Sequence, residues 1–461
     1  MSRTIEQLVD PAHTALIVVD VQNDFTEPAG ICGKAGNDIS AVPGMMDSLL
    51  PLIADARKAG VFIVFLRTIY DDPVLSRALT EQYGRQSFQN LCITGSWGAA
   101  FTDGIDPQDV PSEVIVTKNR YSAFWGSDID LVLRAHGIET VVMTGVATEV
   151  CVESTARDAF FRDYFIVEAA ECVGSYSPQR DAASKVVLQR SFAKIAPSAE
   201  IRSYWAKAKP GPRNWQEAVR HSKELATLEE RLDPAHTALV LVDMQNDFCH
   251  EKGAALSQGG GTSMILETVP RIRKLLDEAR AAGTMVLHVK SECGRPYRNI
   301  GSPRRFADKN VPDGAVGTLS AASLAKSSDL AEATEICIPG TWGAEFVEGL
   351  GPVDDEQVVV KHRFSGFVET RLELLLRAKE IRTVVIAGVT TNVCVESTAR
   401  DAAMRDYYLV VAEDGTAVRD RHRALHDASL ESLRTYFGRV EPIKRIVDTL
   451  HSHNKAMRAT A

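Results

Sequence analysis

The sequence predicts two tandem α/β domains, each a three-layer α/β/α arrangement with a mostly parallel sheet and helices on both faces. Short, continuously apolar segments alternate with amphipathic segments of helical periodicity, the pattern of buried parallel strands joined by helices. The same succession then occurs twice, because residues 4–25 return as residues 227–248, at an offset of 223 residues. Together these two observations predict the fold class and the duplication.

The repeat also sets the expected domain boundaries. Residues 10–25 agree with the second copy at 13 of 16 positions. An offset of this size is far longer than a solenoid unit, so the chain is a duplication of one domain of roughly 200 residues. We expect the first domain at residues 1–206, a linker at 207–226 and the second domain at 227–461. The linker contains Pro210, Gly211 and Pro212, which interrupt any helix there.

Composition narrows the classes of protein to which the chain can belong. The chain has 461 residues, 45% of them hydrophobic, and a net charge of -9, with no basic block to favour a nucleic-acid partner. No apolar run approaches membrane-spanning length and the first ten residues lack a signal-peptide core, so we expect a cytoplasmic protein that contacts no membrane. The eight cysteines are dispersed, which argues against a zinc ribbon or a disulfide scaffold. A small-molecule substrate is the expectation.

Each copy contains alternating strands and helices. In the first copy the expected strands are residues 15–20, 61–68, 112–118, 140–145 and, as the last strand, 165–170. The expected helices are residues 45–60 and 128–137, with a third beginning near residue 151. In open parallel sheets the chemistry lies at the carboxyl ends of the strands.

One strand-to-helix segment is nearly identical in the two copies. Residues 145–164 read GVATEVCVESTARDAFFRDY, and residues 388–407 match them at 16 of 20 positions. The segment delivers Cys151, and Cys394 in the second copy, to the start of a helix. The helix dipole and the unpaired N–H groups of the first turn favour a thiolate and can hold an oxyanion there.

Two further residue types accompany each cysteine at strand ends. Lys118 precedes Cys151 by 33 residues, and Lys361 precedes Cys394 by the same spacing. An aspartate closes the first strand of each copy, Asp20 or Asp243. The aspartate can take the thiol proton, and the ammonium group can hold the resulting charge. This combination is typical of a nucleophilic hydrolase.

The motifs VVDVQNDF, KNRYSAF and GVATEVCVESTARDAFFRDY, with SYSP beyond them, resemble the isochorismatase-like cysteine hydrolases over nearly the full length of both copies. The similarity is strongest to the ureide-cleaving branch, which includes ureidoacrylate amidohydrolase, biuret hydrolase and N-carbamoylsarcosine amidase. The resemblance implies a catalytic Asp-Lys-Cys triad at Asp20, Lys118 and Cys151, and again at Asp243, Lys361 and Cys394. It also implies cis peptide bonds before Ala147 and Thr390, and oxyanion holes built from the backbone N–H groups of Ala147 and Cys151 and of Thr390 and Cys394.

No metal or other cofactor is expected. Metal-binding nicotinamidases of this superfamily carry an Asp-x-His pattern and a further histidine after the second strand. The first copy has no histidine in FLRTIYDDP, and the second has only His288. A lone histidine is more often a packed residue than a metal ligand, since a catalytic site needs several.

Substrate-binding residues are predicted in pairs. Phe25 and Phe248 follow the aspartates, and Trp97 and Trp342 lie in a GxWG loop, where a core role and a pocket role are equally compatible with the sequence. Arg120 and Arg363 follow the lysines; a guanidinium fork there can bind a carboxylate, or can serve a structural role.

The copies differ in two places. Between the second strand and the GxWG loop the second copy carries about 22 extra residues, including residues 295–310, which we expect over the mouth of its site. Glu149 stands where the second copy has Asn392, two residues before the cysteine. Both differences put the equivalence of the two sites in question.

The sequence therefore favours a cofactor-free cysteine amidohydrolase that cleaves a C–N bond of a small ureide or carboxamide through a thioester. Two alternatives stay open: a nicotinamidase-type carboxamidase, and a protein in which one copy is a non-catalytic structural or ligand-binding half. Because two copies of one surface are joined by a short linker, an intramolecular pseudo-dimer is expected, with further homo-oligomers possible.

Overall fold

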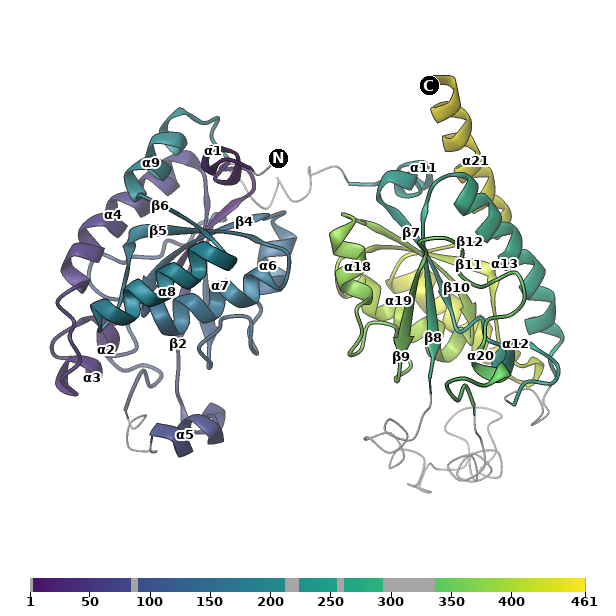
Figure 1. The fold of residues 1–461 in the computed structure, drawn as a ribbon, viewed down its shortest axis with the longest axis horizontal. Coiled ribbons are helices and arrows are strands. Elements are labelled where there is room, and N and C mark those ends of the chain that lie inside the picture. Colours follow the sequence, from purple (N-terminus) through teal and green to yellow (C-terminus); the bar gives the residue numbers. More distant parts are fainter. Residues whose placement is uncertain (1–2, 84–89, 212–223, 255–260, 293–335, 461) are drawn as a thin grey trace. The chain divides into compact units, whose positions relative to one another are not determined.

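The computed structural model describes residues 3–83, 90–211, 224–254, 261–292 and 336–460. The chain divides into two compact units, Met1–Glu224 and Leu225–Ala461, and each unit contains one six-stranded sheet (Figure 1). The expected insertion at residues 295–310 and most of the expected linker lie outside the described residues.

All strands of the first unit run parallel, in the order β3-β2-β1-β4-β5-β6. The strands are β1 Thr14–Val19, β2 Phe62–Thr68, β3 Glu113–Lys118, β4 Thr140–Val146, β5 Phe165–Gly174 and β6 Lys194–Ala196. In the described part of this unit, the helices of at least seven residues are α4 Val42–Ala59, α5 Arg77–Tyr83, α6 Ile129–Ala135, α7 Glu153–Phe160, α8 Pro178–Ser191 and α9 Ser198–Lys207. The chain reverses its direction of winding between β1 and β4, and such a switch point is where open α/β sheets place their binding crevice.

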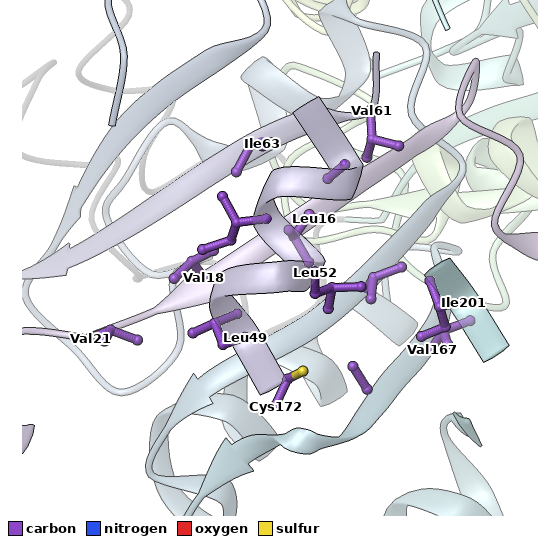
Figure 2. Packing of buried hydrophobic residues seen from close by; sticks show 14 of the residues in the cluster. Leu16, Val18, Val21, Leu49, Leu52, Val61, Ile63, Val167, Cys172 and Ile201 are labelled. Atoms are coloured by element: carbon purple, nitrogen blue, oxygen red, sulfur yellow. The ribbon is translucent and has the colours of Figure 1, made fainter. Parts of the chain in front are cut away.

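Alternate residues of each strand face opposite layers, which produces the three-layer fold. Leu16 and Val18 of β1 pack with Leu49 and Leu52 of α4 on one face (Figure 2). Helix α9 covers the same face, while α6, α7 and α8 cover the other. The i, i+3, i+4 spacing of apolar residues in α4 explains its buried stripe. The helix ends at Gly60, whose φ of 70° is left-handed.

The second unit repeats this architecture, in the order β12-β11-β10-β7-β8-β9. Its strands are β7 Thr237–Val242, β8 Met285–Ser291, β9 Gln357–Lys361, β10 Thr383–Val389, β11 Tyr408–Ala417 and β12 Arg439–Glu441, all parallel. Among the described residues of this unit, the helices of at least seven residues are α13 Ser263–Ala281, α18 Leu372–Ala378, α19 Glu396–Ala403, α20 Arg423–Tyr436 and α21 Ile443–Thr460. Two apolar clusters again lie on the two faces of the sheet, one with α13 and α21 and the other with α18, α19 and α20.

The predicted fold class is confirmed, with one correction at the sheet edge. Residues 165–170 were expected to be the last strand, but β5 runs on to Gly174 and a further strand, β6, pairs with it. Strand β6 has only three residues, too few to show a strand period in the sequence. None of the described helices is both long and apolar enough to span a bilayer.

Candidate active site

The first candidate residue lies just beyond the central strand. Asp20 follows β1 in a left-handed conformation with a φ of 51°, which short polar side chains tolerate better than most. Gly145 of β4 lies beside this strand end with a φ of 101°, and a Cβ there would meet the Val19 carbonyl oxygen at 2.1 Å. The glycine of the predicted motif therefore lets β4 lie close against β1, which brings the segment after β4 toward Asp20.

The aspartate and the lysine of the first unit form a fully buried ion pair. Lys118, the last residue of β3, places its Nζ 2.7 Å from Asp20 Oδ2. The same Nζ donates to Thr68 Oγ1 at 2.7 Å and to the Arg120 carbonyl oxygen at 3.0 Å. Thr68 in turn donates to Asp20 Oδ1 at 2.8 Å. Strand order explains this contact, because β2 lies between β1 and β3 and its last residue joins the two ends.

The second unit reproduces each of these contacts. Lys361 Nζ lies 2.8 Å from Asp243 Oδ2, and it donates to Ser291 Oγ at 2.8 Å and to the Arg363 carbonyl at 3.3 Å. Ser291 donates to Asp243 Oδ1 at 2.9 Å. Asp243 also has a positive φ, of 53°. The two copies have therefore kept the geometry as well as the residue types.

Each cysteine lies in a π-helical turn, Thr148–Val152 or Thr391–Val395, that leads into α7 or α19. The sequence predicted the start of a helix here but not the wider turn, which is common at functional sites. The Cys151 thiol is buried, and it lies near enough to Asp20 and Lys118 for both side chains to change its pKa. Cys394 has the same relation to Asp243 and Lys361. The structure therefore brings the three predicted side chains of each triad together.

Burial shifts the pKa values of the two thiols. Burial raises the pKa of the Cys151 thiol far above its ordinary value, although the Lys118 charge opposes this effect. For Cys394, burial and the Asp243 charge raise the pKa to about 12. Burial therefore opposes the effect of the helix start, which favours the thiolate, and outweighs it in the free site.

The lysines stay charged. Burial is the largest single effect and lowers the pKa of Lys118, but the Asp20 charge and the further interactions with Asp20 and Cys151 together outweigh it, so that the pKa lies above its ordinary value. The same balance raises the pKa of Lys361. Each site thus holds an ammonium group, a carboxyl group and a neutral thiol that loses its proton only when a base accepts it.

The peptide bonds before the π turns are cis, between Val146 and Ala147 and between Val389 and Thr390. These are the positions that the sequence motif indicated. Ala147 and Thr390 precede the first turn that carries the cysteine, so their backbone N–H groups stay candidates for the oxyanion hole.

The QND part of the VVDVQNDF motif has a structural role that the sequence reasoning missed. Gln22 bonds to the backbone N–H and carbonyl of Thr68 and to the carbonyl of Ala99. Asn23 donates to the Trp97 carbonyl at 2.8 Å, and Asp24 accepts from the Cys92 N–H at 2.7 Å. The second unit has the same bonds from Gln245, Asn246 and Asp247. Identity of QNDF in both copies was the signal that could have revealed this anchoring of the GxWG loop.

The predicted substrate-binding residues fall into three groups. Phe25 is half-buried and packs against two apolar clusters, and Phe248 packs against one. Trp97 is 54% exposed and Trp342 is 46% exposed, which excludes the core role for both. The remaining pair consists of Arg120 and Arg363.

These arginines bond to the backbone. The Arg120 guanidinium donates to the carbonyl oxygens of Val74 and Asn119 at 2.8 and 2.6 Å, and Arg363 donates to the His362 carbonyl at 2.7 Å. These contacts favour the structural role for the two guanidinium groups. The backbone carbonyl oxygens of the same arginines accept hydrogen bonds from the lysine ammonium groups.

Two tyrosines that were not among the predicted site residues lie close to the first site. Tyr176, from the SYSP segment, is near Cys151 and Asp20, and its hydroxyl donates to the Phe25 carbonyl at 3.0 Å. Tyr70 follows β2 and is also near Cys151 and Asp20. Burial raises the pKa of both tyrosines, so they are neutral hydrogen-bonding groups beside the thiol.

His288 is a packed residue in this structure. It is fully buried in β8, its Nε2 lies 2.8 Å from Glu356 Oε2, and its ring meets Phe346 edge-on. Over the described ranges, no three His, Cys, Asp or Glu residues are grouped so that they could hold a metal ion.

Comparison with known proteins connects this geometry to a family. The isochorismatase domain family model matches residues 14–200 and 237–444. Ureidoacrylate amidohydrolase RutB of Methylobacterium radiotolerans is 36% identical over 184 residues, covering 37% of this chain and 70% of that protein. RutB of Caulobacter vibrioides is 33% identical over 219 residues, covering 44% of this chain and 96% of that protein.

Among solved structures, N-carbamoylsarcosine amidase from Thermoplasma acidophilum is 29% identical, covers 45% of this chain and 96% of its own, and has a TM-score of 0.34. The two family matches together span most of the sequence and fall one in each structural unit. The chain belongs to the isochorismatase domain family, of which it carries two tandem copies.

Proposed function

We propose that the protein is an amidohydrolase that cleaves the C–N bond of a small ureide or carboxamide by way of a thioester on Cys151 or Cys394. The observation that carries the proposal is the buried aspartate, lysine and cysteine cluster that both units contain. The similarity to proteins named ureidoacrylate amidohydrolase supports the choice of an amide-type C–N bond.

In this mechanism the thiol is neutral until substrate arrives. As the Cys151 sulfur attacks the carbonyl carbon, Asp20 takes the thiol proton, so no free thiolate has to exist in the buried site. The Lys118 ammonium, held protonated by the aspartate, stabilises the negative charge that develops on the sulfur and nearby oxygen. The backbone N–H groups of Ala147 and Cys151 hold the tetrahedral oxyanion.

The second half of the reaction uses the same aspartate. Asp20 gives its proton to the departing ammonia or amine as the C–N bond breaks, which leaves a thioester on Cys151. Asp20 then takes a proton from a water molecule that attacks the thioester carbonyl, and the thiol regains that proton when the C–S bond breaks. The net reaction consumes one water molecule and releases an acid together with ammonia or an amine.

A substrate panel tests the proposal. Biuret, ureidoacrylate, N-carbamoyl amino acids and nicotinamide should be assayed for ammonia release with the full chain. We expect turnover of at least one ureide that is lost after iodoacetamide labels Cys151 and Cys394. Absence of ammonia release from every member, with no faster alkylation of these two thiols than of the others, would show that the site is not a cysteine amidohydrolase.

A further inference from the structure

A buried hydroxyl lies between the two charged side chains of each site, and the mechanism proposed above assigns it no role. Thr68, the last residue of β2, is fully buried, and Ser291, the last residue of β8, is nearly so. Each hydroxyl contacts the aspartate and the lysine of its own unit, at distances of 2.7 to 2.9 Å.

The directions of these hydrogen bonds follow from chemistry. An ammonium group has only donors, so Thr68 Oγ1 must accept from Lys118. The single hydroxyl proton is then donated to Asp20 Oδ1, because an ionised carboxylate only accepts. This contact fixes the carboxylate plane and leaves Oδ2 as the oxygen that faces the ammonium group. The same reasoning applies to the second unit.

The hydroxyl also completes the coordination of the ammonium group. Three acceptors surround Lys118 Nζ: Asp20 Oδ2, Thr68 Oγ1 and the Arg120 carbonyl oxygen. An ammonium group has three hydrogens, so each has one of these partners. Removal of the hydroxyl would leave a buried N–H and a buried carboxylate oxygen short of a partner, and would free both side chains to rotate.

We propose that Thr68 and Ser291 are positioning residues that hold the aspartate so that Oδ2 can accept the thiol proton. The inference rests on the proposed function, because it assigns the aspartate as the base for the thiol. The internal repeat supports it: around this position the copies differ, Arg67 and Ile69 in one and Lys290 and Glu292 in the other, yet both retain a hydroxyl.

The test uses the full chain with one site silenced. In a Cys394→Ala background, Thr68→Val removes the hydroxyl with little change of shape, whereas Thr68→Ser installs the side chain of the other unit. Thr117→Val is the matched control, because Thr117 lies on β3 next to Lys118 but is exposed and accepts only from Arg67 among the described contacts.

We expect Thr68→Val to lower kcat by about 10- to 100-fold with KM changed by less than about threefold, as for loss of one preorganised hydrogen bond. Thr68→Ser should restore most of kcat, and Thr117→Val should match the parent. Retention of kcat in a folded Thr68→Val variant, or failure of serine to restore it, would overturn the inference.

The pH profile separates positioning from a general loss of structure. Asp20 is faced by Lys118 and Cys151, and by Tyr70, Tyr176 and Cys92 at a greater distance. Loss of a hydrogen bond to the charged carboxylate makes that carboxylate hold a proton more tightly. The acidic limb of kcat/KM should therefore move to higher pH in Thr68→Val and return in Thr68→Ser, whereas a purely structural role predicts an unmoved limb.

Two further measurements keep the outcomes distinct. Should Thr68→Val fail to fold, the smaller change Ser291→Ala, with Ser291→Thr as its rescue in a Cys151→Ala background, decides the question. Should the parent hydrolyse no member of the panel, the proposed function fails while the inference is still tested by iodoacetamide labelling of Cys151. Slower labelling in Thr68→Val, restored by serine, supports positioning of the base, and equal labelling rates overturn it.

Discussion

The two units hold the same aspartate, lysine and cysteine at their sites but differ in the side chains that surround them. The lysine-to-aspartate distance is 2.7 Å in the first unit and 2.8 Å in the second, and the bridging hydroxyl differs only by a methyl group. Strand order and register determine these contacts, and both sheets share them. Buried strand positions away from the aspartate, lysine and cysteine differ more between the two units.

Two buried positions illustrate the divergence. Glu168 pairs in register with Met143 of β4, and the corresponding residue of the second unit, paired with Ile386, is Val411. Both carboxylate oxygens of Glu168 are buried, with no hydrogen-bond partner among the described residues. Burial raises its pKa to about 7. The second sheet has an apolar side chain at the same point.

At the other position the second unit carries the polar residue and the first unit carries the apolar one. Phe65 of β2, paired with Val18, meets Phe101 edge-on. In the second unit the residue paired with Leu241 is His288, whose ring meets Phe346 and bonds to Glu356. The polar His288 is tolerated there because it bonds to the partly buried carboxylate of Glu356, whereas Glu168 has no such partner among the described residues. The comparison therefore predicts that differences in the buried layers change stability, and that differences beside the cysteines change the reaction.

The largest expected effect separates the two nucleophiles. Cys151→Ala and Cys394→Ala should each lower kcat/KM by about 10³-fold or more, but toward different members of the ureide panel, because a covalent nucleophile is lost in each case. Measurement of ammonia release by both variants checks this. Loss of all activities in Cys151→Ala alone, with Cys394→Ala unchanged, would mean that the second unit is a scaffold.

The next largest effect concerns the buried carboxyl. The pKa of Glu168 in the folded chain, about 7, lies above its unfolded value, so folding favours the protonated form. The free energy of unfolding of the first unit should therefore fall by on the order of 3 kcal/mol as the pH rises from about 4.5 to 7. It should stay low above that range. Glu168→Val should remove this slope and slow hydrogen exchange in β1 at pH 8.

The reciprocal change is the control for that prediction. Val411→Glu should introduce the same pH dependence into the second unit and leave exchange in β1 of the first unit unaltered. An unchanged exchange rate in β7 at pH 8 would contradict the idea that an unpartnered carboxyl is costly at this position.

A smaller effect is expected beside the nucleophiles. Glu149 lies two residues before Cys151 and is paired with Arg180 at 3.3 Å, whereas the second unit has Asn392 there. Glu149→Asn removes one negative charge near the first site and leaves the Arg180 charge unpaired, so kcat/KM for an anionic N-carbamoyl amino acid should rise relative to neutral biuret by roughly tenfold. Added salt should reduce this gain, and Asn392→Glu should shift the second site in the opposite direction. Equal ratios in the parent and both variants would exclude a role in specificity.

The smallest effect tests metal independence. His288→Phe gives the second unit the residue that the first unit has at this point, and we expect kcat/KM within about twofold of the parent, since the ring contacts Phe346 and Glu356 rather than the site. Dialysis against a strong chelator should also leave turnover unchanged. Activity that is lost on dialysis and restored by zinc would contradict the prediction.

The sequence by itself determined the fold class, the duplication and the strand ends that carry Asp20, Lys118 and Cys151. These features depend on local periodicity and on comparison of one copy with the other, and both can be read along the chain. The cis positions before Ala147 and Thr390 followed from the family motif.

The tertiary structure decided what these residues contact. Thr68 joins Asp20 to Lys118 only because β2 lies between β1 and β3, and strand order is not encoded in any one segment. The thiol of Cys151 is neutral because long-range packing buries it, which outweighs the local effect of the helix start. The Arg120 guanidinium bonds to carbonyl oxygens, one of them 46 residues away at Val74. Burial and long-range hydrogen bonds depend on the assembled sheet, and for that physical reason they could not be predicted from sequence pattern alone.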